Sequence, residues 1–173
     1  HTFALCLYVL EKLKRYDDYV KSGTYAAQSR FSNFDLPFFE LAGKTWGIVG
    51  MGNIGRKVAQ IAAAFGCRVI FYSVTGKSSC TDYERVDFDT LLAESDVLSL
   101  HCPLTAENHH LINAETLSMV KPGVLLLNTA RGSLIDEAAL RKALLNGQIA
   151  GAAVDVAERE PIPADSPLLG LNN

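Results

Sequence analysis

The stretch TWGIVGMGNIGRKV, residues 45–58, decides the fold, because an apolar strand runs into a glycine-rich turn that opens a helix. Gly50 permits a tight turn, Gly52 leaves no side chain between the backbone and a ligand, and Gly55 allows close packing of helix on strand. Free N–H groups at the start of the helix favour a phosphate. The context favours the pyrophosphate of a dinucleotide over the alternative, a tight turn without a ligand.

Short apolar segments alternate with amphipathic ones on both sides of this turn. We expect strands at 45–49, 68–72, 97–100, 124–128 and 150–154, and helices at 54–65, near 88–94, near 114–119 and at 137–145. Asp136 can cap the last helix, and Asn146-Gly147 can close it. Strands that alternate with helices in this way predict an α/β fold, a doubly wound parallel sheet of the Rossmann type with helices on both faces.

The first 44 residues have a different pattern. Apolar residues at helical spacing predict one amphipathic helix from Thr2 to about Val20, which Gly23 ends. From there to Gly43 we expect an irregular arm, whose aromatic residues pack in a core or at a subunit interface: Phe31, Phe34, Phe38 and Phe39. The expected organisation is a single unit over residues 1–173, with a helix and arm at 1–44 and the sheet at 45–173.

Composition limits the classes of partner. The formal net charge of -3 and the absence of a Lys/Arg run argue against binding of nucleic acid or of an anionic membrane surface. No apolar stretch is long enough to span a bilayer, so we expect a cytoplasmic protein whose partners are small molecules or protein. The four cysteines have no metal-ligand spacing and are expected to be reduced and mostly buried.

The end of the second expected strand bears on the choice of cofactor. An acidic residue about 18 positions after the third glycine would bond the ribose 2′-hydroxyl of NAD. Here the sequence has Ser73, with Lys77 shortly after it. Either Ser73 bonds the ribose of NAD, or the hydroxyls of this region and Lys77 donate hydrogen bonds to the 2′-phosphate of NADP, so the cofactor is NAD or NADP.

Charged residues follow the last two expected strands. Arg131 comes after strand 124–128, and ligands of doubly wound sheets bind outside the carboxyl ends of strands. A cation there would clamp a substrate carboxylate and polarise a ketone, although a surface salt bridge is the simpler alternative. Asp155 ends the last strand, where it can accept a bond from the nicotinamide carboxamide. Either Glu158 or Glu160 could raise the pKa of a histidine that acts as general acid.

Four motifs in the same order resemble those of the D-isomer-specific 2-hydroxyacid dehydrogenases. They are GMGNIG (50–55), LHCPLT (100–105), NTARGSLID (128–136), and GAAVDV (151–156) with Glu160-Pro161. The resemblance covers nearly the whole chain and implies hydride transfer between NAD(P)H and a 2-keto acid. Residues 36–45 and the acid-free region at Tyr72-Ser73 are similar to glycerate dehydrogenase or hydroxypyruvate reductase relatives, which implies a substrate like hydroxypyruvate or glyoxylate.

The resemblance also implies roles for individual residues. It makes Arg131 the residue that binds and polarises the substrate, and Glu160 the partner of the catalytic histidine. It assigns the cofactor contacts by part: the pyrophosphate to Asn53 and Ile54, the nicotinamide half to Thr129, Ala130, Arg131 and Asp155, and the adenosine side to Cys102, Pro103 and Asn108. The first helix and the arm would embrace a second subunit, so a homodimer is expected.

Two expected parts of such an enzyme are missing from the sequence. The family's general acid is a histidine beyond the glutamate, and no histidine follows Glu160. The substrate domain is absent as well, so we expect a cofactor domain excised from a longer enzyme, able to bind dinucleotide but without useful dehydrogenase activity. The alternative function is a non-catalytic NAD(H)-sensing module, similar to transcriptional co-repressors that share the fold, the arginine and the glutamate.

Overall fold

The computed structural model describes residues 1–33 and 39–171. Phe34 and Phe38, assigned above to the aromatic arm, lie outside these residues. The helices and short 3-10 helices are α1 (Thr2–Leu10), α2 (Leu13–Lys21), α3 (Thr24–Ala27), α4 (Asn53–Ala64), α5 (Phe88–Glu94), η1 (Ala106–Asn108), α6 (Ala114–Met119), η2 (Gly132–Leu134) and α7 (Glu137–Leu145). The strands are β1 (Thr45–Val49), β2 (Arg68–Tyr72), β3 (Glu84–Arg85), β4 (Val97–Leu100), β5 (Val124–Asn128) and β6 (Ile149–Val154).

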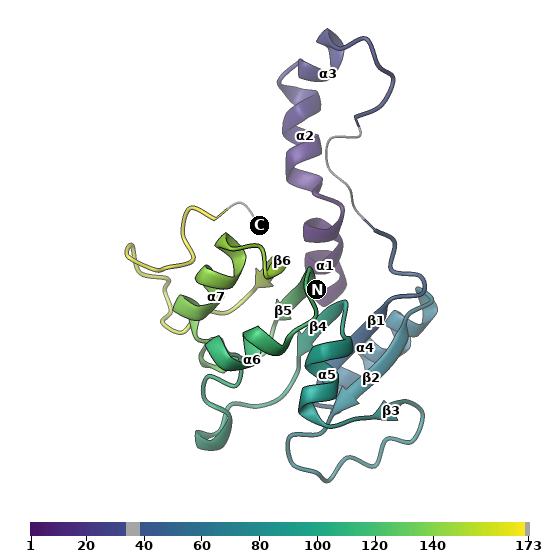
Figure 1. The fold of residues 1–173 in the computed structure, drawn as a ribbon, viewed down its shortest axis with the longest axis vertical. Coiled ribbons are helices and arrows are strands. Elements are labelled where there is room, and N and C mark those ends of the chain that lie inside the picture. Colours follow the sequence, from purple (N-terminus) through teal and green to yellow (C-terminus); the bar gives the residue numbers. More distant parts are fainter. Residues whose placement is uncertain (34–38, 172–173) are drawn as a thin grey trace.

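The strands form one parallel sheet in the order β3-β2-β1-β4-β5-β6, which confirms the predicted fold class (Figure 1). The chain moves outward from β1 to β3, then crosses back to place β4 on the other side of β1. The strand order therefore reverses between β1 and β4, and in such sheets the ligand crevice lies outside the carboxyl ends of the strands at that point.

Alternate residues of each strand pack on opposite faces of the sheet, because side chains in a strand have a period of two. In β5, Leu125 and Leu127 join a buried cluster with residues of α1 and α4, whereas Val124 and Leu126 join a cluster with residues of α5, α6 and α7. The sheet is thus covered on both faces. Its near-continuous apolar strands follow from this double burial.

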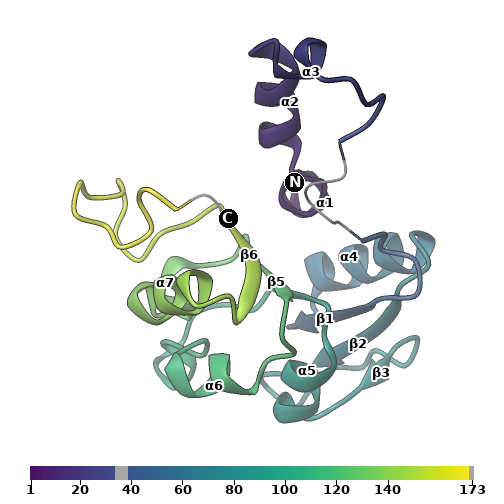
Figure 2. The same cartoon turned by 45° about the horizontal axis from the view of Figure 1, so that its top comes forward.

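The first helix is not continuous, which corrects the prediction of one helix from Thr2 to about Val20. α1 ends at Leu10, and Lys12 has a φ of 54° in the left-handed region before α2 begins. α1 buries Thr2, Cys6 and Leu10, whereas α2 buries no residue. Both ribbon views show α2 and α3 standing away from the sheet (Figures 1 and 2). The break therefore separates a helix packed on the sheet from a projecting one.

The other differences are small. β3, a strand of two exposed residues, was not predicted, and β6 begins at Ile149 instead of residue 150. The predicted caps are confirmed: the Asp136 carboxylate accepts bonds from the amides of Ala138 and Ala139, and Gly147 has a φ of 76° after α7. No helix in residues 1–33 or 39–171 has the length and hydropathy needed to cross a bilayer.

Candidate functional site

The glycine turn joins β1 to α4 with the geometry that its sequence requires. Gly50 has a φ of 96°, and a Cβ there would lie 2.9 Å from the amide nitrogen of Cys102. A Cβ at Gly55 would lie 2.1 Å from the Gly50 carbonyl oxygen, so a side chain would push α4 off the turn. Gly50 thus makes the turn and its contact with the end of β4, and Gly55 allows the close packing of helix on strand.

Gly52 differs from these two glycines, because a Cβ built there meets nothing within 4 Å. It is the exposed N-cap of α4, with Asn53 and Ile54 exposed beside it. An open backbone surface at the positive end of a helix fits the pyrophosphate of a dinucleotide. The exposed backbone at Gly52 therefore leaves room for the pyrophosphate that the sequence predicts there.

The residues assigned to the adenosine side lie in the loops after β2 and β4. The Ser73 side chain is buried, and its hydroxyl accepts a bond from the Ser78 amide at 3.3 Å. Cys102 and Asn108 are buried, while Pro103 is exposed. The Asn108 side chain accepts from the Thr105 amide at 2.7 Å and donates to the Pro103 carbonyl at 2.8 Å. Asn108 thus fixes the shape of this loop.

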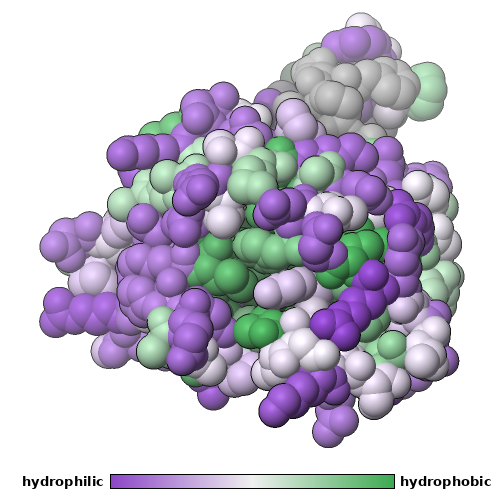
Figure 3. Space-filling model, turned by 60° about the horizontal axis from the view of Figure 1, so that its bottom comes forward, coloured by the Kyte–Doolittle hydropathy of each residue, from purple (hydrophilic) through white to green (hydrophobic). Residues whose placement is uncertain are grey.

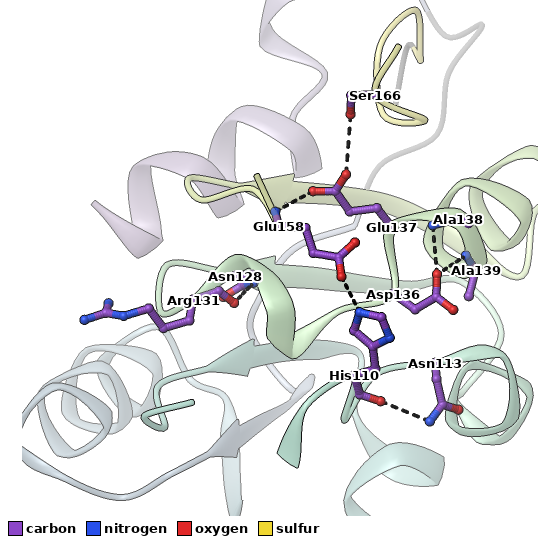
Figure 4. A network of polar contacts seen from close by, with 10 residues as sticks. All are labelled: His110, Asn113, Asn128, Arg131, Asp136, Glu137, Ala138, Ala139, Glu158 and Ser166. Carbon is purple, nitrogen blue, oxygen red and sulfur yellow. Dashed lines mark hydrogen bonds and ion pairs between the residues drawn. The ribbon is translucent and has the colours of Figure 1, made fainter. Parts of the chain in front are cut away.

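Thr129, Ala130 and Arg131 follow β5 at the same edge of the sheet. The buried Asn128 side chain accepts a bond from the Ala130 amide and donates to the Arg131 carbonyl, so it sets this turn. The guanidinium of Arg131 is exposed and donates to the Ala130 carbonyl at 2.7 Å. In Figure 4 the Arg131 side chain extends away from the neighbouring polar network. Arg131 is therefore available to an anionic ligand.

Asp155 and Glu160 lie on the segment that follows β6. The Asp155 carboxylate lies 3.1 Å from Nε2 of His1, and the Thr2 and Thr129 hydroxyls are 3.3 Å apart. The start of α1 therefore lies over the ends of β5 and β6. Glu160 is exposed, and its carboxylate accepts a bond from the Ala157 amide at 3.0 Å.

Arg131 and Glu160 line the same pocket, which has a volume of about 310 Å³. Ser133, Glu158 and the apolar side chains of Leu104 and Val156 complete much of its wall. A cation, two carboxylates and a few apolar groups line this pocket, so it can contact both the polar and the apolar parts of a small ligand, and Arg131 is the group in it that can bind an anion. The face shown in Figure 3 is hollowed near its centre, where hydrophobic surface is gathered within a hydrophilic rim.

Sequence reasoning missed two residues that hold the wall of this pocket. A Cβ at Gly132 would lie 1.9 Å from the Ala157 carbonyl oxygen, so only glycine admits this segment against η2. The buried Glu137 carboxylate accepts a bond from the Glu158 amide at 2.8 Å and lies 3.4 Å from the Ser166 hydroxyl (Figure 4). Both contacts join segments far apart in sequence, and neither belongs to a local pattern. The only sequence signal was the position of Gly132 directly after Arg131.

The histidines differ in burial and in their partners, whereas the four cysteines are all buried. Burial lowers the pKa of His101 to about 4, and its Nε2 has no hydrogen-bond partner. His110 is ion-paired with Glu158, while His109 is exposed. All four cysteines are free and buried, as predicted. Burial raises the pKa of the Cys6 thiol to about 12, which keeps it protonated and unreactive.

Comparison with known proteins identifies the family. Residues 3–173 match the model for the NAD-binding domain of D-isomer-specific 2-hydroxyacid dehydrogenases. A glyoxylate reductase from Thermococcus litoralis is 46% identical over 164 residues, which cover 92% of this chain and 49% of that protein. A hydroxypyruvate reductase from Blautia hydrogenotrophica is 39% identical over 173 residues, or 98% of this chain and 53% of that protein.

A solved structure agrees with these matches. The D-lactate dehydrogenase from Aquifex aeolicus, complexed with NAD and lactic acid, superposes with a TM-score of 0.83 at 40% identity, over 91% of this chain and 46% of that one. The chain spans about half the length of the curated relatives it matches. The family model covers almost every residue, including the glycine turn and the Arg131 pocket. This chain belongs to the family of NAD-binding domains of the D-isomer-specific 2-hydroxyacid dehydrogenases.

Proposed function

We propose that this chain is the cofactor domain of a longer NAD(P)-dependent dehydrogenase that reduces a small 2-keto acid. The observation that carries the proposal is the pocket shared by Arg131 and Glu160, which lies at the edge of the sheet that also carries the glycine turn. Relatives named glyoxylate reductase and hydroxypyruvate reductase support glyoxylate or hydroxypyruvate as the substrate. Bound NAD(P)H would supply the hydride.

Each part of the cofactor and the substrate would be bound by residues of a different loop. Gly52, Asn53 and Ile54 would hold the pyrophosphate at the start of α4, and Ser73 the adenosine ribose. Thr129, Ala130 and Asp155 would orient the nicotinamide at the ends of β5 and β6. Arg131 would bind the substrate carboxylate and polarise its ketone, because a guanidinium binds a carboxylate with two parallel bonds. Glu160 would hold the catalytic histidine in its charged form by ion pairing.

His101 is unsuited to donate the proton in this reaction. Its ring is largely buried, and its pKa of about 4 leaves it neutral at physiological pH. We propose that the donor histidine lies outside residues 1–173, because the family resemblance places it beyond Glu160 and no histidine follows Glu160 in this sequence. The chain by itself should bind dinucleotide and show no steady-state reduction of hydroxypyruvate or glyoxylate. A normal turnover would contradict the proposal that the proton donor lies outside this chain.

The substrate role of Arg131 is tested in the longer enzyme by Arg131→Gln. Removing one charge-stabilising donor from an active site costs about 100- to 1,000-fold in rate, and we expect kcat/KM for glyoxylate and hydroxypyruvate to fall by that factor. The matched control is Arg159→Gln, since Arg159 is an exposed arginine on the segment after β6 and does not line the pocket. Equal rates for the two variants would remove Arg131 from the mechanism.

The choice between NAD and NADP depends on the loop after β2. Lys77 is exposed there, and Ser73 is the residue at the position where an acid would exclude a 2′-phosphate. Parallel titration of the chain with NADH and NADPH, followed by nicotinamide fluorescence, distinguishes a ribose contact of Ser73 from a phosphate contact of Lys77. Similar affinities support the ribose contact of Ser73, whereas a strong preference for NADPH that Lys77→Gln abolishes assigns the phosphate to Lys77.

We also propose that the first 44 residues form a homodimer contact. α2 and α3 project from the sheet and expose apolar side chains, among them Leu13, Val20 and Tyr25. Exposed apolar surface of this kind is typical of subunit interfaces. Size-exclusion chromatography with light scattering should give twice the chain mass, and a monomer at high concentration would contradict the proposal.

A further inference from the structure

Two adjacent histidines and a distant glutamate form a cluster on one side of the Arg131 pocket. His109 and His110 follow η1, and Glu158 lies on the segment after β6. One imidazole nitrogen from each histidine and one carboxylate oxygen of Glu158 all lie within 4.8 Å of one another. The family roles discussed above use none of these three side chains as a ligand or an acid.

The backbone at His110 brings the two rings together. In an extended chain consecutive side chains point to opposite sides. His110 has a φ of 52°, in the left-handed region that non-glycine residues seldom adopt, at a cost on the order of 1 kcal/mol. As a result the His109 and His110 rings stack at a centroid distance of 3.9 Å. Both imidazoles therefore lie near Glu158, and the exposed His109 ring can turn out of the stack so that a nitrogen of each ring faces one ion.

Hydrogen bonds from other elements hold this arrangement in place (Figure 4). The His110 amide donates to the Ser133 carbonyl at 2.9 Å, and the His110 carbonyl accepts from the Asn113 side chain at 3.0 Å. On the opposite side, the Glu158 amide is bonded to the buried Glu137 carboxylate at 2.8 Å. The backbone that carries His110 and Glu158 is thus fixed before any ligand arrives.

We propose that His109, His110 and Glu158 bind one divalent transition-metal ion, with Zn²⁺ as the best fit. Two imidazoles and a carboxylate are a ligand set that zinc accepts, and three protein ligands leave a fourth position for water or an anion. Ca²⁺ and Mg²⁺ are disfavoured because they select oxygen ligands. The ion would replace the His110–Glu158 ion pair and tie the loop after η1 to the segment after β6.

The ion would also change the pocket, because Glu158 is part of its wall. A carboxylate held by Zn²⁺ no longer presents its full negative charge beside Arg131, and the segment after β6 gains a second anchor. Protection of the Glu158 segment from hydrogen exchange should therefore increase when Zn²⁺ is added. The metal site does not depend on the proposed dehydrogenase activity, since it rests on these three residues alone.

The test uses the tag-free chain with Zn²⁺ in calorimetry and with Co²⁺ in absorption spectroscopy. We expect one ion per chain and a Co²⁺ visible spectrum without thiolate charge-transfer bands, since all four cysteines are buried. Absence of binding at millimolar metal would show that the cluster is an ion pair only and would overturn the proposal. Thiolate bands would do so as well, because they would place the ion on cysteine.

Three single substitutions test the ligands one by one: His109→Ala, His110→Asn and Glu158→Gln. Asparagine is chosen at 110 because it tolerates the left-handed conformation. Loss of a second-sphere partner already weakens metal binding by about 10- to 100-fold, so each ligand variant should lose at least that much affinity. Thermal unfolding in EDTA checks that each variant folds, and the exposed His109 gives a variant with little risk of misfolding.

The matched control is His1→Gln. His1 pairs with Asp155 much as His110 pairs with Glu158, and with its terminal amine it is a chelator in its own right. Zinc affinity should be unchanged in this control. Loss of binding in His1→Gln, with binding retained in the three ligand variants, would assign the metal to the chain terminus and overturn the proposed site.

Discussion

The two loops of the candidate site, the turn after β1 and the turn after β5, each depend on a glycine, but these glycines pack against different atoms. At Gly55 a Cβ would lie 2.1 Å from the Gly50 carbonyl oxygen, within one turn of the chain. At Gly132 it would lie 1.9 Å from the Ala157 carbonyl oxygen and 2.4 Å from the Glu158 amide nitrogen, on a distant segment. A short motif encodes the first contact, whereas the second exists only in the folded sheet.

The largest effect is expected for Gly55→Ala. The blocking atom is backbone, so the turn and α4 must separate, which should reduce the free energy of unfolding by about 3 kcal/mol or more and abolish dinucleotide binding. Urea unfolding and NADH titration measure the two losses.

Gly52→Ser separates the loss of dinucleotide binding from the loss of stability. A side chain at 52 meets nothing within 4 Å, and serine is a good N-cap, so stability should stay within about 0.5 kcal/mol of the parent. NADH binding should still be lost, because the serine side chain would occupy the path of the pyrophosphate. Equal destabilisation by Gly55→Ala and Gly52→Ser would show that the close contact at Gly55 is not what the turn requires.

A second large effect concerns His101, whose carbonyl lies against Gly50. Burial lowers the pKa of this histidine to about 4, from 6.5 for an ordinary histidine. The unfolded chain therefore takes up the proton at higher pH than the folded chain does. The stability that this group contributes is complete above pH about 6.5, declines as the pH falls towards about 4, and changes no further below that, for a total of up to about 3 kcal/mol.

His101→Leu isolates this contribution, because leucine fills the buried site without a titrating group. Urea unfolding of both proteins between pH 4 and 7 should give a difference in stability that favours the variant increasingly at low pH. Parallel pH profiles would mean that the ring is hydrated in the folded protein.

The sheet and its helices were predictable because their patterns are local. Four of the five predicted strands match β1, β2, β4 and β5 residue for residue, since buried strands of a parallel sheet are short apolar runs. The break at Lys12 was not predictable, because neither glycine nor proline marks it and α1 ends where its contact with the sheet ends. β3 was missed because Glu84 and Arg85 are exposed and carry no apolar pattern.

The candidate site divides in the same way. The sequence singles out four residues because they come shortly after a predicted strand: Gly50, Gly52, Gly55 and Arg131. Their assignment to cofactor or substrate remains a prediction. The roles of Gly132 and Glu137 come from contacts with the segment after β6, which no spacing in the sequence reveals. His110 faces Glu158 for the same reason. Long-range contacts in the pocket wall are therefore the part that only the structure supplies.

An intermediate effect is expected for Gly132→Ala. The added methyl also meets backbone, but Ala157 and Glu158 lie outside the helices and strands, so their segment can shift without moving α7 or the sheet, and overpacking of this kind costs about 2 kcal/mol. Hydrogen exchange at the Glu158 amide should speed up, while NADH affinity should fall far less than in Gly55→Ala. Ser133→Ala, at the next position in the pocket wall, should leave both quantities unchanged. Complete loss of NADH binding in Gly132→Ala would show that the two loops are not independent.

The smallest effect is expected for Asp136→Ala at the start of α7. The Asp136 carboxylate accepts bonds from the Ala138 and Ala139 amides, both at 3.0 Å, and loss of such a cap costs about 1 kcal/mol. Asp136→Asn keeps an acceptor of the same length and should lose almost nothing. Because Glu137 is the first residue of α7, fraying there should also loosen its bond to the Glu158 amide, detectably by hydrogen exchange but less than in Gly132→Ala. A cap variant that loosens Glu158 as much as Gly132→Ala would move the main support of the pocket wall from the glycine contact to the Glu137 carboxylate.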